Sequence, residues 1–349
     1  MNVVLRTLLC VAVIGGLSCV ELQVAITDLT TGDPPVVPPR TMDLGSLGGG
    51  SRSAMDINDN GMVIGFADVE DVGDHAFRWT AEDGMIDLGT SGGLQSRAFG
   101  VNINGEVCGV SQGTDGEPND AVVWSATGEV RVLARLADGD SEANDINDLG
   151  QVCGSSTAED DILRAVLWEP DGTLVVLGPL GGPRTISSAI NNLSQVTGTG
   201  EVELGGDSRA FVWSAESGIE SLGTLGGNLS QGFGIDDLGR VVGRANLEEG
   251  GNRYAFVWTR ERGMIDLGAL GGPGSEAFAL NTDGIIIGES SVVSGGVKAF
   301  VATIDGGMRQ LPDLGARATN TARGINRHGS IVGFANDPNR VTRAIQWVE

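Results

Sequence analysis

Hydrophobic positions along this chain recur in short runs, and no window keeps the 3.6-residue period of an amphipathic helix. The first clear unit contains four such runs, at Arg52 to Ile57, Met62 to Ala67, His75 to Thr80 and Met85 to Gly89. Turns rich in Asn, Asp and Gly separate them, beginning with Asn58-Asp59-Asn60-Gly61. Short apolar runs joined by such turns predict four strands connected as hairpins.

The same unit recurs about every 45 residues. Its third strand carries the pattern Ala-x-x-Trp, which ends at Trp79, Trp124, Trp168, Trp213, Trp258 and Trp347, with Ala302 in the one remaining place. The turn between the first two strands keeps the same spacing through Gly61, Gly105, Gly150, Gly239, Gly284 and Gly329, with Ser194 in the fourth unit. Two independent markers with one period predict seven copies of a four-stranded unit.

A unit of this size cannot bury both faces of its sheet alone, and stacking around an axis solves the problem. The last unit ends after its third strand, whereas Thr41 to Leu44 precede the first unit without a partner. We therefore predict an all-β fold, a seven-bladed β-propeller over residues 41–349, closed by the N-terminal strand that completes the last blade. We expect a monomer, because closure removes the sheet edges.

The first residues have the composition of an export signal. Arg6 precedes the apolar run Thr7 to Ile14, which is too short for a transmembrane helix. We predict a signal peptide at residues 1–19 and a Pro-containing linker at 20–40. Cys19 follows Gly16-Leu17-Ser18 and resembles the lipidated Cys of bacterial lipoproteins, although small residues here also suit ordinary cleavage. The protein is therefore expected to be extracellular, periplasmic or at the cell surface, with no transmembrane span.

Charge narrows the range of partners. The chain has 46 acidic and 22 basic side chains, a formal net charge of −24, and 56 glycines. Such a surface repels phosphate backbones, which excludes nucleic acid, and attracts cations or basic partners. Solubility of an exported protein explains the same charge without any partner.

The repeat elements also resemble a known family. His75-Ala76-Phe77, the INDNG-type turn, the VVG-type strand and the GMIDLGTLGG-type connector resemble the HAF-repeat family of exported bacterial proteins, over about residues 41 to 349. The resemblance implies an exported, repeat-built protein and brings no activity and no functional residues. Copies four, six and seven depart from the pattern, for example at Ala302.

Three features of the repeats could indicate a binding site or a disulfide, and each also has a purely structural explanation. The tryptophans could stack on sugars, but their strict recurrence favours packing between blades. The turn from Asp56 to Gly61 resembles a calcium loop, but the closing Glu of such a loop is absent, and hairpin chemistry explains it. We therefore expect no cofactor. Cys108 and Cys153 hold equivalent positions in neighbouring copies, too far apart for a disulfide, so we expect free buried thiols.

Catalytic signatures are missing from the sequence. His75 and His328 have no nucleophile nearby in the chain, and no GxSxG, HExxH or CxxC motif occurs. Carboxylates are abundant, and none is singled out as a catalytic residue.

The loop between the second and third strands varies between copies and is acidic. Insertions in repeat proteins gather on the binding face, although solvated loops also drift freely. The candidate binding face consists of Asp68, Glu70, Asp71, Asp74, Asp115, Glu117, Asp120, Glu159, Asp160, Asp161, Glu201, Glu203, Asp207, Glu248 and Glu249.

Two functional hypotheses follow. The first is an exported binding or scaffold propeller whose acidic loops meet a protein, a glycan or a cationic ligand. The alternative is a carbohydrate-active hydrolase or lyase that uses two carboxylates on this face or in the central channel. A pair of acids that breaks the repeat pattern and meets in a pocket with a raised pKa would favour the enzyme.

Overall fold

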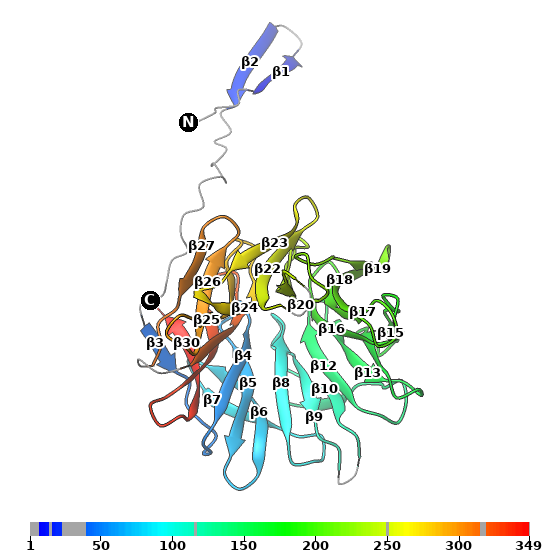
Figure 1. The fold of residues 1–349 in the computed structure, drawn as a ribbon, viewed down its shortest axis with the longest axis vertical. Coiled ribbons are helices and arrows are strands. Elements are labelled where there is room, and N and C mark those ends of the chain that lie inside the picture. Colours follow the sequence, from blue (N-terminus) through cyan, green and yellow to red (C-terminus); the bar gives the residue numbers. More distant parts are fainter. Residues whose placement is uncertain are drawn as a thin grey trace.

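The structure is a computed structural model that describes residues 7–13, 16–22, 40–114, 117–248, 251–314 and 319–348. Strands β1 (Thr7–Val13) and β2 (Gly16–Leu22) pair with each other as a separate antiparallel sheet. All other described strands belong to seven four-stranded antiparallel sheets arranged as blades around a centre (Figure 1). Within the described ranges no helix is long and apolar enough to cross a membrane.

The first four blades each take four consecutive strands. Blade 1 contains β4 (Arg52–Ile57), β5 (Val63–Val69), β6 (Gly73–Thr80) and β7 (Gly84–Gly89). Blade 2 contains β8 (Ser96–Val101), β9 (Val107–Ser111), β10 (Asp120–Trp124) and β11 (Val130–Val132). Blade 3 contains β12 (Ser141–Ile146), β13 (Val152–Thr157), β14 (Leu163–Trp168) and β15 (Leu174–Val176). Blade 4 contains β16 (Thr185–Ile190), β17 (Val196–Glu201), β18 (Ser208–Ser214) and β19 (Gly218–Ser221).

The next two blades follow the same order, and the last one differs. Blade 5 contains β20 (Ser230–Ile235), β21 (Val241–Asn246), β22 (Arg253–Thr259) and β23 (Gly263–Gly268). Blade 6 contains β24 (Gly271–Leu280), β25 (Ile286–Val292), β26 (Val297–Thr303) and β27 (Gly307–Gln310). Blade 7 contains β28 (Asn320–Ile325), β29 (Ile331–Asn336), β30 (Thr342–Val348) and, as its outer strand, β3 (Arg40–Asp43).

The N-terminal strand closes the ring as predicted. Thr41 lies opposite Trp347 in an antiparallel register, and the backbone N–H of Leu44 donates to the carbonyl of Ala344 at 3.0 Å. The first strands of the blades contact one another in a complete circle, including β28 with β4. The seven-bladed propeller is therefore confirmed, and its first strands surround a central channel.

The tryptophans of the third strands pack between blades. Trp124, Trp168 and Trp347 are almost fully buried and Trp213 is buried, whereas Trp79 and Trp258 are half-buried against the core. Trp168, for example, shares a cluster with Cys108 and Val123 of the preceding blade. Ala302 is buried in the same place in blade 6. Core packing was the correct interpretation of the Trp repeat.

The turn between the first two strands of each blade ties the ring together at one end of the channel. The turn Asn donates from Nδ2 to the backbone carbonyl of the matching residue in the next blade. These bonds run from Asn58 to Asn102, Asn102 to Asn147, Asn147 to Asn191, Asn191 to Asp236, Asn281 to Asn326 and Asn326 to Asn58. Asp236 has no amide, and Arg240 takes over by donating to the carbonyl of Asn281 at 3.0 Å. We call this end of the channel the turn side.

A glycine in every second strand permits a close approach to the first strand. A Cβ at Gly243 would lie 1.9 Å from the carbonyl oxygen of Gln231, which no side chain can tolerate. The matching glycines at 65, 109, 154, 198, 288 and 333 face the same carbonyl position at 1.9–2.1 Å. The third residue of the VVG pattern must therefore be Gly, because the backbones of the first and second strands approach too closely for a side chain.

Candidate functional site

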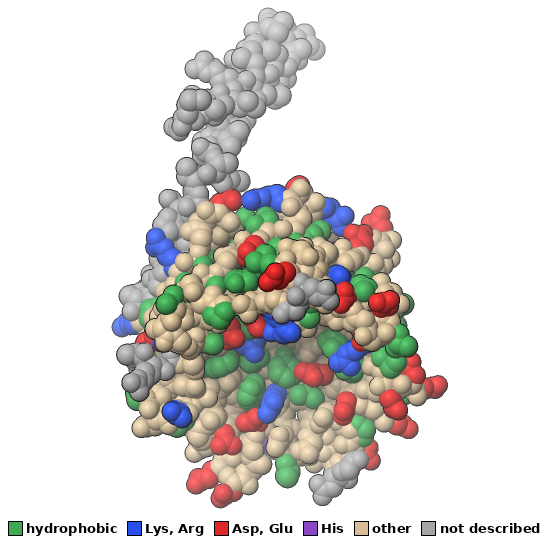
Figure 2. All heavy atoms as spheres, viewed as in Figure 1, with side chains coloured by type: hydrophobic (Ala, Val, Ile, Leu, Met, Phe, Trp, Pro, Cys, Tyr) green, Lys and Arg blue, Asp and Glu red, His purple; other side chains and the backbone are tan. Residues whose placement is uncertain are grey.

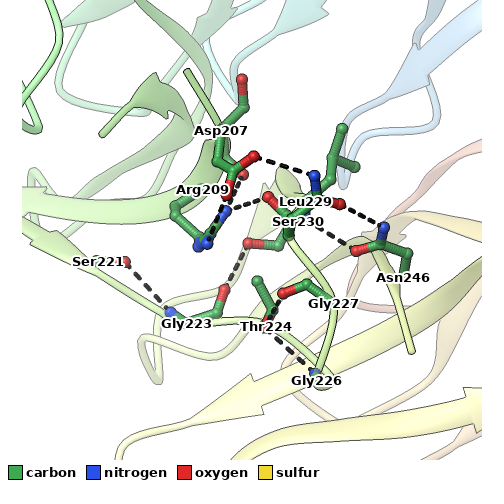
Figure 3. A network of polar contacts seen from close by, with 12 residues as sticks. Asp207, Arg209, Ser221, Gly223, Thr224, Gly226, Gly227, Leu229, Ser230 and Asn246 are labelled. Carbon is green, nitrogen blue, oxygen red and sulfur yellow. Dashed lines mark hydrogen bonds and ion pairs between the residues drawn. The ribbon is translucent and has the colours of Figure 1, made fainter. Parts of the chain in front are cut away.

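The acidic loops and the connectors between blades lie on the same side of the propeller. The backbone N–H of Gly49 donates to the carbonyl of Asp68 at 3.0 Å, and Gly182 makes the matching bond to Glu201 at 2.8 Å. Around the fourth connector, Asn228 hydrogen-bonds to both Asp207 and Asn246. Arg209 pairs with Asp207 in the same network (Figure 3). We call this side, opposite the turn side, the connector face.

Many of the predicted acidic residues are engaged in local structure. Four form ion pairs with arginines, namely Asp74 with Arg97, Asp120 with Arg135, Asp160 with Arg164 and Asp207 with Arg209. Asp68 accepts a hydrogen bond from the backbone of Gly50, and Asp71 and Asp161 hold left-handed turn positions. Glu201 pairs through its backbone, whereas Glu70, Glu117, Glu159, Glu203 and Glu248 are exposed. Asp115 and Glu249 lie outside the described residues.

A cavity of about 660 Å³ lies at the centre of the ring, within the circle of first strands. A smaller cavity of about 200 Å³ occupies the turn side. Figure 2 shows the viewed face hollowed near its middle, where hydrophobic side chains meet basic and acidic ones. We call the larger cavity the channel mouth. None of the predicted acidic loop residues lines it.

The residue at the β-bulge of each first strand points into the channel mouth. These residues are Met55, Phe99, Asn144, Ser188, Phe233, Phe278 and Arg323. In every blade the register of the first two strands shifts at this residue. A β-bulge redirects the side chain of its extra residue, and the repeated bulge therefore aims seven side chains of five residue types at one space. Their diversity breaks the sevenfold pattern of the fold.

Arg323 is the cation of this cavity. Its guanidinium carbon lies 4.2 Å from the ring centre of Phe278 and 6.0 Å from that of Phe334. Its Nε is buried without a hydrogen-bond partner, and the guanidinium makes no ion pair with a described residue. Burial lowers the pKa of Arg323, while Glu289 and Glu276 oppose this shift. The side chain stays charged at neutral pH and keeps unused donors.

The neighbouring charges are mostly satisfied. Arg244 pairs with Glu276, donates from Nε to Oε1 of Gln231 at 2.7 Å, and its guanidinium carbon lies 5.6 Å from the ring centre of Phe233. Glu289 accepts a hydrogen bond from Thr321 at 2.6 Å. Glu142 is solvent-exposed and accepts none from the described residues; desolvation raises the pKa of its carboxyl group, and the charge of Arg97 opposes this shift. A carboxylate on blade 3 and a guanidinium on blade 7, neither hydrogen-bonded to a described residue, therefore line one cavity.

Asp56 and Asp145 also line the channel mouth and occupy equivalent positions in blades 1 and 3. Burial raises the pKa of Asp56 to about 6 and that of Asp145 to about 8. Each carboxylate links two blades. Asp145 accepts the backbone N–H groups of Ile146 (2.8 Å) and Ile190 (2.9 Å), and Asp56 accepts those of Ile57 (2.8 Å) and Val101 (3.0 Å).

The raised pKa of Asp145 predicts the direction of a pH effect on stability. Between its ordinary value of 3.8 and about 8, the folded chain binds a proton that the unfolded chain releases. Stability from this group is therefore full at low pH and falls as the pH rises, by about 1.4 kcal/mol per pH unit. Urea unfolding at several pH values measures the slope. The slope should become shallower in Asp145→Asn and stay unchanged in Glu82→Gln, an exposed control; equal slopes would contradict the assignment.

The remaining candidate residues are placed outside this cavity. Cys108 and Cys153 are buried free thiols, as expected, and burial raises the pKa of both. His75 Nδ1 lies 2.9 Å from the carboxylate of Asp87, and His328 lies in a turn-side loop.

Asn58 Oδ1 accepts the backbone N–H groups of Asn60 and Met62, so hairpin hydrogen bonds explain the calcium-like turn. No cluster of three His, Cys, Asp or Glu suited to a metal occurs among the described residues. Cys19 lies in β2, and its side chain is outside the described part.

The sequence reasoning missed the residues of the channel mouth. In the first strand the residue before the bulge is always small and the residue two after it is always aliphatic, while the bulge residue itself changes from Met to Phe, Asn, Ser and Arg. That variation at one register position was the available signal.

Comparisons with known proteins support the fold. TolB from Acinetobacter baumannii matches with a TM-score of 0.51 at 11% identity, over 76% of this chain and 65% of that one. The β-propeller domain of the Trilobed protease from Pyrococcus furiosus matches with a TM-score of 0.58 at 10% identity, over 85% and 93%. Puromycin hydrolase matches with a TM-score of 0.56 at 13% identity, over 90% and 55%.

These likenesses concern the fold alone, because the identities are low. The chain spans less than two thirds of the TolB chain and about half of puromycin hydrolase. The Pyrococcus domain is described as having an open velcro topology, whereas here β3 pairs with β30. No family model matches the sequence, and no curated protein is similar enough to match it.

Proposed function

We propose that this chain is an exported binding propeller whose ligand site is the channel mouth. The observation that carries the proposal is the set of seven bulge residues, of five residue types, aimed into one cavity of about 660 Å³. A purely structural channel needs no such diversity, since the packing positions beside it are nearly uniform. A cavity of this volume with apolar rings and a few polar groups is typical of small-molecule and peptide sites.

The exposed acidic side chains of the connector face surround this site. They favour a ligand or partner with positive charge at its periphery, because unpaired surface carboxylates attract cations. Their role in this proposal is to guide and select partners, while the channel mouth supplies the enclosed contacts.

The test is a screen of defined amino acids, short peptides, sugars and organic ions against the purified protein by thermal shift. The matched variant is Ser188→Trp, which places a large ring in the channel mouth, and the control is Asp161→Asn on an outer loop. We expect at least one compound class to stabilise the wild type and the control but not Ser188→Trp. The proposal is wrong if no compound binds at about 1 mM, or if every hit binds the blocked variant equally well.

The alternative function is a carbohydrate-active hydrolase or lyase that uses Asp56 and Asp145. Their raised pKa values and their place in a concave site are the features expected of an acid/base pair. Their four backbone hydrogen bonds give each carboxylate a structural role without catalysis, so we rank this function second. Release of reducing ends from glycans that is abolished in both Asp56→Asn and Asp145→Asn, with folding intact, would favour the enzyme.

A further inference from the structure

We propose that the channel mouth binds a zwitterionic ligand with an apolar side chain, of the chemical class of a short peptide with free ends. This inference rests on the proposed function and names the ligand class of the same site. It has three parts, which are an anion position, an apolar wall and a cation position.

Arg323 defines the anion position. Arg131, Arg184, Arg253, Arg309 and Arg340 also make no hydrogen bond with a described residue, but all five are exposed to water. Arg323 is held between two aromatic rings, and its buried Nε has no partner at all. A buried donor without a partner is unfavourable, and a carboxylate can accept two parallel hydrogen bonds from one guanidinium. A ligand carboxylate would therefore accept the hydrogen bonds that the Arg323 guanidinium does not make within the described chain.

Two phenylalanines form the apolar wall, and a third faces them across the channel. The rings of Phe233 and Phe278 lie 5.7 Å apart on adjacent blades, and Phe99 lines the same cavity from blade 2. All three are half-buried although each belongs to a first strand near the centre of the fold. Phe233 and Phe278 leave apolar surface facing the cavity on the side of Arg323, and Phe99 does so from across the channel, so an aliphatic or aromatic side chain of a ligand between them would be removed from water.

Glu142 defines the cation position. Blade 3 lies across a seven-membered ring from blades 6 and 7, so Glu142 faces the wall that carries Phe278 and Arg323. Its carboxylate accepts no hydrogen bond from the described residues, and Asn144 lies beside it. Glu276 and Glu289 add negative charge that would repel a simple anion. A ligand with an ammonium group at one end and a carboxylate at the other can pair with Glu142 and with Arg323. The size of the cavity accommodates a dipeptide.

The experiment is isothermal titration of the full chain with the dipeptide Ala-Phe, its C-terminal amide and its N-acetyl form. We expect Ala-Phe to bind, and each blocked form to bind about tenfold more weakly or worse, because each loses one charge-assisted contact. In Arg323→Gln the acid and the amide should bind equally, and in Glu142→Gln the free and acetylated amines should bind equally. Arg327→Gln on the turn side and Glu159→Gln on an outer loop are matched controls that should leave all ratios unchanged.

Equal binding of the three probes to the wild type overturns the inference, and this result does not depend on any variant folding. Absence of binding by every probe also overturns it. If another compound class from the screen binds the wild type and fails on Ser188→Trp, the proposed function stands and only the ligand class is wrong. Persistence of the acid-to-amide ratio in Arg323→Gln, with thermal unfolding like that of the wild type, would likewise exclude Arg323 as the anion position.

Discussion

A chain that begins at Gly45, and so lacks β3, is expected to lose about 3–6 kcal/mol of its free energy of unfolding. Blade 7 would keep only three strands. The edge of β30, with its buried Ala344 and Ile345, would lose the strand that pairs with it. The lost terms are the β3–β30 hydrogen bonds and the burial of Leu44 and Met42 against the core.

The truncation has a matched control. A chain that begins at Arg40 removes the same upstream segment but keeps β3, and its stability should stay within about 1 kcal/mol of the full chain. Urea unfolding followed by tryptophan fluorescence measures both, since Trp347 pairs with Thr41. An added peptide with the sequence of residues 40–44 should restore part of the lost stability. The Gly45 chain should also self-associate, because a free strand edge pairs with other chains. Equal stability of the two truncated chains would mean that the ring does not depend on β3.

Trp168→Ala is expected to destabilise the fold by about 3–5 kcal/mol. Trp168 is 1% exposed, packs between blades 2 and 3, and donates from Nε1 to the carbonyl of Ala134 at 2.6 Å. The substitution opens a cavity between two blades and leaves that carbonyl without its partner. Chemical unfolding measures the loss.

Leu193→Ala is the control for this substitution. Leu193 is 62% exposed at the tip of a turn, so its truncation should change stability by about 0.5 kcal/mol or less. A small effect of Trp168→Ala would indicate that the blades do not depend on this contact. It would then favour an exposed role for the recurrent tryptophans, such as binding sugars.

Much of the fold could be predicted because a repeat supplies the same information seven times. The Ala-x-x-Trp strand is required for packing between blades, and the turn Asn for hydrogen bonding around the channel. The VVG strand has its Gly because two backbones approach closely, as at Gly243. The unpaired Thr41 to Leu44 and the incomplete last unit predicted closure. The observed strand, Arg40–Asp43, is shifted by one residue.

The site could not be found in the same way. Binding residues depart from the repeat, and a departure such as Arg323 looks in sequence like any other irregularity. Phe99, Phe278 and Arg323 face the channel mouth because each lies at a β-bulge, and the sequence pattern does not predict these bulges. The acidic loops were predicted as the binding face because they vary in length and charge, but ion pairs such as that of Asp160 with Arg164 explain part of their composition. Export, lipidation of Cys19 and the HAF-repeat resemblance remain predictions.

The central claim is that the channel mouth holds the ligand, and a crystal structure of the protein with the tightest compound from the screen tests it most directly. We predict that the compound lies among Phe99, Phe278 and Arg323, with an acceptor oxygen within hydrogen-bond distance of the Arg323 guanidinium. A compound found only on the turn side or on the outer loops, with the channel mouth filled by water, would contradict the account.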